Sequence, residues 1–232
     1  MFNLETNKSS WRDVFSESLG KIVVNQTIFI DKVMESNGGW SLDFDKGIFS
    51  LGDDEFPFQF IGSESNSSNT WLWGWENVNG FPDDLLDAAN QTRKFGEECG
   101  LMPLMTAELE LTSEIYGHTL SIIAASIFGG KACYYYAGSQ DGLSIFFTVH
   151  NLPDEMFASA NMQKFIDFTM ISIQNHDLNH PIFIKSFLTQ NNTPYEQKDN
   201  SIIAHFENDQ TLQIDFQEVA GNWRISKFGV DK

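Results

Sequence analysis

The residues best suited to chemistry lie in the stretch TWLWGWEN, which carries three of the six tryptophans. Trp71, Trp73 and Trp75 recur at every second position, so on a strand their side chains share one face. Indole rings stack on sugars, nucleobases or cations, and the indole N–H can orient a polar ligand. Glu64 and Glu76 flank this region. The pattern predicts either an aromatic core or a ligand-binding site at these five residues.

The neighbouring aromatic residues favour the core. Phe56, Phe58 and Phe60 alternate in the same way just before the tryptophans. If the two strands pair with matching faces, six rings form one layer, which a soluble monomer must cover. The N-terminal segment, with Trp11 and Phe29 at helical spacing, is the expected cover. A pocket floored by the tryptophans and a surface for a protein partner are the alternatives.

Histidines and cysteines give no recognisable site. His176 and His180 are four residues apart, a spacing that can bind zinc on a helix, but no general-base Glu lies between them. Because Pro181 follows directly, helix is disfavoured there and we expect a surface loop. Cys99 and Cys133 have the spacing of neither a zinc site nor a disulfide framework.

Catalytic motifs are missing from the sequence. It contains no Gly-x-Ser-x-Gly elbow, no phosphate-binding loop and no dinucleotide fingerprint. We therefore predict no catalytic residue, no metal site and no cofactor. An enzyme would need residues that come together from distant segments, which leaves that possibility open but less favoured.

The elements that must position these residues alternate between helical and strand periodicity. A helix is predicted from Ser9 to Ser36, capped by Ser9 or Ser10, weakened at Gly20 and stopped at Asn37-Gly38-Gly39. We expect further helices over 81–100, 109–128, 162–173 and 182–188. We expect strands over 40–45, 47–52, 56–65, 70–77, 132–138, 142–150, 201–209, 210–219 and 222–230. The stretch NNTPYEQKDN has the composition of a linker.

These elements predict an α+β fold. An N-terminal helix packs on an antiparallel sheet that includes the tryptophan strand, and a C-terminal helix with a three-stranded antiparallel meander follows. Residues 1–152 are expected to form the first domain and residues 153–232 a second unit. The second unit could equally extend the first domain, because its strands could join the same sheet.

Charge narrows the range of partners. The formal net charge is −18 in 232 residues, while 41% of the residues are hydrophobic. Such a field repels nucleic acid and anionic membrane surfaces and attracts basic partners. The simpler alternative is that the excess acid keeps an aromatic-rich chain soluble. Neither a signal peptide nor a run of apolar residues long enough for a membrane helix is present, so we expect a cytoplasmic location.

Two longer stretches strengthen this picture by resemblance. GWSLDFDKGIFSLGDDEFPFQFIGSES and NTWLWGWENVNGFPDDLLDAANQTRKFGEECG resemble an uncharacterised family of bacterial proteins, a domain of unknown function with a TWLWGW-like motif. The resemblance covers roughly residues 35–150. It implies a cytoplasmic bacterial protein of α+β type and carries no activity with it.

Three functions are compatible with these observations. The first is a noncatalytic binding protein, of immunity or regulatory type, that captures a basic protein partner through its acidic surface. The second is a small-ligand-binding protein or unrecognised enzyme with its pocket at Trp71, Trp73 and Trp75. The third is a subunit of a homo-oligomer that covers its aromatic surface at an interface. The sequence favours the first.

Overall fold

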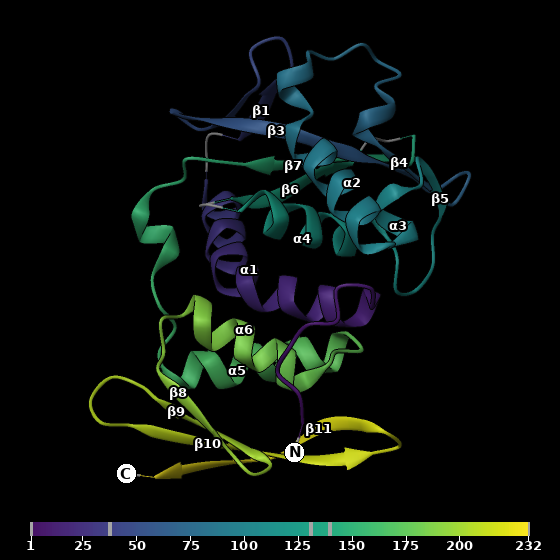
Figure 1. Ribbon diagram of the computed structural model, residues 1–232. Coiled ribbons are helices and arrows are strands. Elements are labelled where there is room, and N and C mark those ends of the chain that lie inside the picture. Colours follow the sequence, from purple (N-terminus) through teal and green to yellow (C-terminus); the bar gives the residue numbers. More distant parts are fainter. Residues whose placement is uncertain (1, 37–38, 130–131, 139–140, 232) are drawn as a thin grey trace. The chain divides into compact units, whose positions relative to one another are not determined.

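The computed structural model describes residues 2–36, 39–129, 132–138 and 141–231, and they fall into two compact units (Figure 1). Residues 25–157 form one, here called the central unit. Residues 1–24 and 158–232 form the other, here called the terminal unit. The first helix, α1 (Trp11–Glu35), contributes its first part to the terminal unit and its last part to the central unit.

The predicted N-terminal helix is confirmed as α1. Ser10 caps it, since its hydroxyl accepts the Asp13 N–H at 3.3 Å. The helix continues through Gly20, where we expected weakening. A Cβ at Gly20 would lie 2.7 Å from the carbonyl oxygen of Phe183, so the glycine permits close packing within the terminal unit. The predicted stop at Asn37-Gly38 lies outside the described residues.

The central unit is built on a seven-stranded antiparallel sheet. Five strands follow the order β1-β2-β3-β4-β5, and β7 pairs with both β3 and β6. The strands are β1 (Trp40–Asp43), β2 (Ile48–Leu51), β3 (Asp54–Ser65), β4 (Thr70–Trp73), β5 (Glu108–Glu110), β6 (Cys133–Gly138) and β7 (Leu143–Val149). The helices are α2 (Asp87–Cys99), α3 (Met102–Met105) and α4 (Gly117–Phe128), with 3-10 turns η1 (Gly74–Glu76), η2 (Asp83–Leu85) and η3 (Asp154–Phe157). Helices α2 and α4 both pack on β3 (Figure 1).

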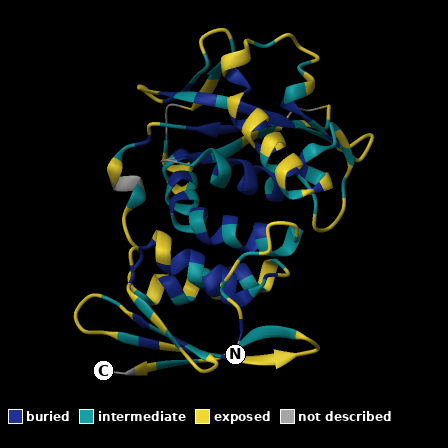
Figure 2. Cartoon of the chain, viewed as in Figure 1, coloured by how far each residue is buried: buried dark blue, intermediate teal, exposed yellow. Residues whose placement is uncertain are grey.

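The predicted four-strand antiparallel meander is confirmed as β1-β2-β3-β4. Phe49 pairs with Phe56 between β2 and β3, and Glu64 pairs with Trp71 between β3 and β4. Gly47 has φ +66°, a conformation that favours glycine and completes the turn into β2. One core cluster of this unit gathers the buried residues Phe29, Val33, Phe49, Leu51, Phe56, Phe58, Phe60, Leu85, Leu86, Cys133, Phe147, Val149 and Leu152. Figure 2 shows such buried segments along the sheet and α4.

The hairpin of β6 and β7 is confirmed, and a side chain covers part of its edge. Tyr134 of β6 donates its backbone N–H to Gln26 Oε1 at 2.9 Å. Its carbonyl oxygen accepts from Gln26 Nε2 at 2.7 Å. The amide of Gln26 thus replaces the neighbouring strand that β6 lacks on this side, which blunts the edge against pairing with other chains. Ser139 and Gln140 of the predicted turn lie outside the described residues.

One predicted helix is wrong in its first half. Residues 109–128 were expected to be helical, but Glu108–Glu110 form β5 and the helix starts at Gly117. Leu109 pairs with Trp71, so sheet pairing overrides the local helical pattern. At the start of α4 the backbone N–H of Tyr116 donates to Thr119 Oγ1 at 3.1 Å.

The terminal unit combines helices with a four-stranded antiparallel sheet. Its elements beyond α1 are α5 (Met162–Asn175), α6 (His180–Gln190), β8 (Tyr195–Lys198), β9 (Ser201–His205), β10 (Thr211–Val219) and β11 (Asn222–Asp231). The sheet order is β11-β10-β9-β8. The predicted meander is β9, β10 and β11, and β8 adds a fourth strand from the stretch that resembled a linker. Tyr195 pairs there with Ala204.

Candidate functional site

The three tryptophans form a continuous row of rings, but only two of them lie on the strand. Trp71 and Trp73 are in β4 and are buried, with 0% and 1% of their surface exposed. Strand β4 ends at Trp73, and Trp75 lies half-buried in η1. The rings of Trp71 and Trp73 meet edge to face at 5.3 Å, and Trp75 stacks on Trp73 at 4.6 Å. The expected strand of three tryptophans is therefore corrected to a strand followed by a 3-10 turn.

A glycine lets the chain turn after Trp73. A Cβ on Gly74 would lie 2.9 Å from the carbonyl oxygen of Ile61, so only glycine brings η1 this close to β3. Asn77 then closes the turn in the left-handed region, with φ 46° and its N–H donated to the Gly74 carbonyl. Gly74 and Asn77 are residues typical of a turn, but the alternation of tryptophans through Trp75 favoured the prediction of a strand.

The expected layer of six aromatic rings is wrong, because the phenylalanines and tryptophans use opposite faces of the sheet. Phe58 packs on Phe147 at 5.4 Å, whereas Trp71 packs on Phe146 at 5.3 Å. Phe146 and Phe147 are consecutive in β7, so they point to opposite faces. The cause is a register shift between β3 and β7 at Ile61, an extra residue that reverses the alternation along β3.

The two buried indoles differ in how their N–H groups are satisfied. Trp73 donates its Nε1–H to the Pro103 carbonyl at 3.0 Å. Trp71 Nε1 is buried and has no hydrogen-bond partner among the residues that the structure describes. A buried donor without a partner carries a desolvation cost of about 1–3 kcal/mol. The guanidinium of Arg93 lies 5.8 Å from the ring centroid of Trp75, within the range of a cation–π contact.

Of the two glutamates predicted for the site, Glu64 lies beside the tryptophans. It is directly opposite Trp71 in the β3–β4 pairing and therefore on the same face. Its Oε2 accepts the backbone N–H of Gly117 at 2.7 Å, so a carboxylate complements the positive end of α4. Glu76 is exposed in η1, and among the described residues no hydrogen bond or ion pair joins it to Glu64.

A cluster of titratable aromatic residues that the sequence did not predict surrounds His118. His118 Nδ1 lies 3.2 Å from the hydroxyl of Tyr134, and the direction of this hydrogen bond depends on the imidazole tautomer. The imidazole also meets the rings of Tyr136 at 4.8 Å and Phe146 at 5.3 Å. Burial lowers the pKa of His118, and the nearby Glu64 partly offsets this.

This cluster can exchange hydrogen bonds and protons, since a neutral imidazole both donates and accepts. Burial raises the pKa of Tyr134, so its hydroxyl stays protonated near neutral pH. The hydrogen bond to Tyr134 satisfies one ring nitrogen of His118. The alternation in ACYYYAG places Tyr134 and Tyr136 on one face, and this was the available signal.

The predicted surface loop at His176 and His180 is wrong for His180, which lies in a helix. Helix α5 ends before His176, and His180 is the first residue of α6, where it is 7% exposed. His180 Nδ1 accepts the Ile225 N–H at 3.1 Å, which gives it a structural contact. Pro181 lies in the first turn of α6, where its missing N–H costs nothing. Among the residues described, no group of three or more His, Cys, Asp or Glu side chains is arranged to hold a metal ion.

Negative charge is concentrated in the central unit. Its sequence holds twenty acidic and five basic residues, a net charge of −15. The terminal unit holds twelve acidic and nine basic residues, a net charge of −3. Both units together give the −18 of the chain. The electrostatic field of this protein therefore originates mainly in residues 25–157.

Comparison with known proteins places most of the central unit in a family. Residues 12–152 match a family of unknown function, DUF6882. No curated protein and no solved structure matches. Along the described chain no helix is both long and apolar enough to span a membrane. The resemblance predicted from residues 35–150 is confirmed and extends to residue 12: the chain belongs to DUF6882, a family of unknown function.

Proposed function

We propose that this chain is a noncatalytic binding protein whose central unit captures a basic protein partner. The observation that carries the proposal is the difference in net charge between the units, −15 against −3. A charge that served solubility alone would need no such concentration. A surface that steers a cationic partner benefits from it, because long-range attraction increases the rate of association.

The acids of the central unit are available for such a partner. Asp53, Asp54 and Glu55 follow one another at the β2–β3 turn, and all three are exposed. The ion pairs given for described residues of this unit join Asp43 to Lys46 and Arg93 to Glu97. Neither of these ion pairs includes an acid of the turn, and of the three only Glu55 has a longer-range attraction to Lys46 among the described residues. Attraction of this kind weakens over a Debye length of about 8 Å at physiological salt.

The proposal is tested by affinity capture with two matched variants. The first, D53N/D54N/E55Q, removes three exposed negative charges from the central unit. The control, E196Q/D199N/E207Q, removes three exposed charges from the terminal unit. Immobilised proteins are incubated with native lysate of the source cells at about 20 mM and about 150 mM salt, and retained proteins are quantified by mass spectrometry.

At low salt we expect the wild type and the control to retain the same basic proteins. The first variant should retain several-fold smaller amounts of these proteins. Raising the salt concentration should release the captured basic proteins from the wild type and from the control. Equal retention by both variants would contradict a specific role of the central unit. Recovery of the bait alone at low salt would contradict capture of a basic partner altogether.

Small-ligand binding at the tryptophan row is a second candidate, because Trp71 Nε1 is buried without a described partner. A ligand acceptor could satisfy this donor, and Glu64 lies opposite on the same face. Trp71 is fully buried, so entry requires an opening movement of the unit. A thermal-shift screen of the wild type against W71F tests this function. A compound that stabilises only the wild type supports it, and equal shifts contradict it.

A further inference from the structure

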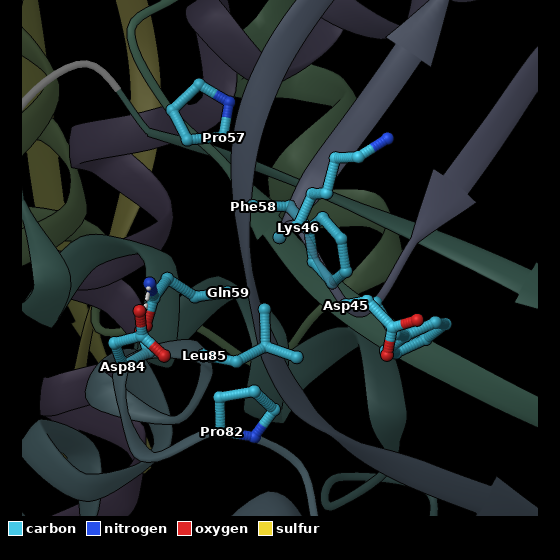
Figure 3. A pocket seen from close by; sticks show the side chains of 10 residues that line it. Asp45, Lys46, Pro57, Phe58, Gln59, Pro82, Asp84 and Leu85 are labelled. Carbon is cyan, nitrogen blue, oxygen red and sulfur yellow. Dashed lines mark hydrogen bonds between the residues drawn. The ribbon is translucent and has the colours of Figure 1, made fainter.

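The β1–β2 turn, the middle of β3 and the segment before α2 enclose a hollow of about 240 Å³ in the central unit (Figure 3). Its lining residues are Phe44, Asp45, Lys46, Gly47, Pro57, Phe58, Gln59, Pro82, Asp84 and Leu85. Small-molecule sites typically measure about 300–1,000 Å³. This hollow is smaller, and its size suits one side chain of a partner.

The base of the hollow is apolar and firmly packed. Phe58 and Leu85 are 1% and 4% exposed. The ring of Phe44 stands edge to face on Phe58 at 5.3 Å and stacks on Phe81 at 4.9 Å. These contacts fix the aromatic wall before any partner binds, which reduces the entropy lost on binding.

A hydrogen bond holds the acidic side of the hollow in place. Gln59 of β3 donates its Nε2–H to the backbone carbonyl of Asp84 at 2.7 Å. Figure 3 shows this contact as a dashed line, with the carboxylates of Asp84 and Asp45 on opposite sides of the hollow. Both aspartates are exposed, and within the described chain neither forms a direct ion pair.

The one basic residue in the lining, Lys46, forms its ion pair with Asp43 and acts on Asp45 only by longer-range attraction. Lys46 Nζ lies 2.9 Å from Asp43 Oδ2, and the same carboxylate accepts the Lys46 backbone N–H at 3.0 Å. In Figure 3 the ammonium group points away from Asp45 and Asp84. The local balance at the hollow is therefore negative, with two carboxylates beside aromatic and proline rings.

We propose that this hollow receives an arginine side chain of the basic partner; this inference rests on the proposed function. The planar guanidinium stacks on an aromatic face and donates in several directions at once. In this proposal the guanidinium lies against the aromatic wall of the hollow, and the carboxylates of Asp45 and Asp84 in the lining are its acceptors. Lysine carries a compact, strongly hydrated charge and cannot make this combination.

The test uses the acetylated, amidated peptides Gly-Gly-Arg-Gly-Gly and Gly-Gly-Lys-Gly-Gly as probes, titrated into the full-length chain at low salt. Binding is followed by ¹H–¹⁵N NMR at the backbone amides of Gly47 and Gln59, which line the hollow. We expect the arginine peptide to shift both amides and to bind at least about threefold more tightly than the lysine peptide.

Three single variants separate the hollow from general charge. D45N and D84N each remove one charge at the hollow, and D53N removes one exposed charge at the β2–β3 turn, outside the lining. We expect D45N and D84N each to weaken binding of the arginine peptide about fivefold, and D53N to weaken it less than twofold. Since all three residues are exposed, the fold is expected to be retained, and the NMR spectra report this directly.

The outcomes distinguish this inference from the proposed function. If all three variants weaken the peptide equally, the hollow is refuted while charge-driven capture stands. If the wild type shows no shifts at Gly47 and Gln59, the hollow is likewise refuted, and the capture experiment alone then decides the proposed function. If capture fails while the arginine peptide binds as expected, the hollow stands as a cation site without the proposed protein partner.

Discussion

Gly62→Ala is the substitution that most directly tests how the tryptophan row is packed. Gly62 of β3 lies opposite Trp73 of β4. A Cβ added there would lie 2.5 Å from Trp71 Cζ2 and 2.6 Å from the carbonyl oxygen of Leu72. The first atom belongs to a fully buried ring and the second to the backbone, so neither can move aside cheaply.

The magnitude follows from two opposing contributions. Overpacking a well-packed core typically costs about 1–3 kcal/mol, and here two rigid neighbours are involved. Gly62 does not have a positive φ, so alanine tolerates its backbone conformation. The reduced entropy of the unfolded chain therefore returns about 0.4–1 kcal/mol. With two rigid neighbours we take the upper end of the overpacking cost, about 3 kcal/mol, so the free energy of unfolding should fall by about 2 kcal/mol.

Urea unfolding followed by far-UV circular dichroism and by tryptophan fluorescence measures this loss. The matched control is Gly138→Ala in β6 of the same sheet, where the added Cβ would meet Ser144 Oγ at an ordinary 3.6 Å. It should raise the free energy of unfolding by about 0.4–1 kcal/mol, because it keeps the entropic gain without the overpacking. A Gly62→Ala protein as stable as this control would refute the packing described for Trp71.

Two further predictions concern buried polar groups. Trp73→Phe should cost about 1 kcal/mol more than Trp71→Phe in urea unfolding, because only Trp73 loses a hydrogen bond, that to Pro103; equal losses would count against this assignment. Burial lowers the pKa of both His150 and His180 to about 4 in the folded chain. In the unfolded chain both pKa values are about 6.5, so between about pH 6.5 and about pH 4 these histidines are protonated mainly when the chain is unfolded. Stability should therefore fall as the pH drops from about 6.5 towards 4, by about 2 kcal/mol per histidine at pH 5, and His180→Asn should flatten part of this slope in denaturant titrations at pH 7 and pH 5.

Local turn chemistry made much of the meander predictable. Asp45-Lys46-Gly47 and the alternation in the flanking strands placed β1, β2 and β3 correctly, because glycine with φ +66° permits the turn. The end of helix α2 was likewise predictable from Gly100, which adopts φ +69°. Its predicted start at residue 81 was wrong, because Asp83–Leu85 form the 3-10 turn η2 and α2 begins at Asp87. At these turns the local conformational preference agrees with the final fold, so a single sequence is enough to predict them.

The remaining features depend on contacts between distant segments. Ile61 can be recognised as an extra residue in β3 only from the pairing with β7, which lies more than eighty residues later in the sequence. The side chains of β3 after Ile61 therefore point to the opposite face of the sheet from the one that simple alternation predicts. Glu108–Glu110 became a strand because β4 offered an edge to pair with. His118 meets Tyr134 only after α4 and β6 have packed. Spacing along the chain could not show these contacts.

Strand β3 explains why the acidic hollow and the tryptophan row can be separate sites. Before the irregularity at Ile61, Phe58 and Gln59 line the hollow. After it, Gly62 and Glu64 face the tryptophans of β4. One strand thus supplies both, while the shift at Ile61 directs them to different neighbours. Charge can therefore be altered at Asp45 or Asp84 without changing the β3 residues that pair with the buried tryptophans.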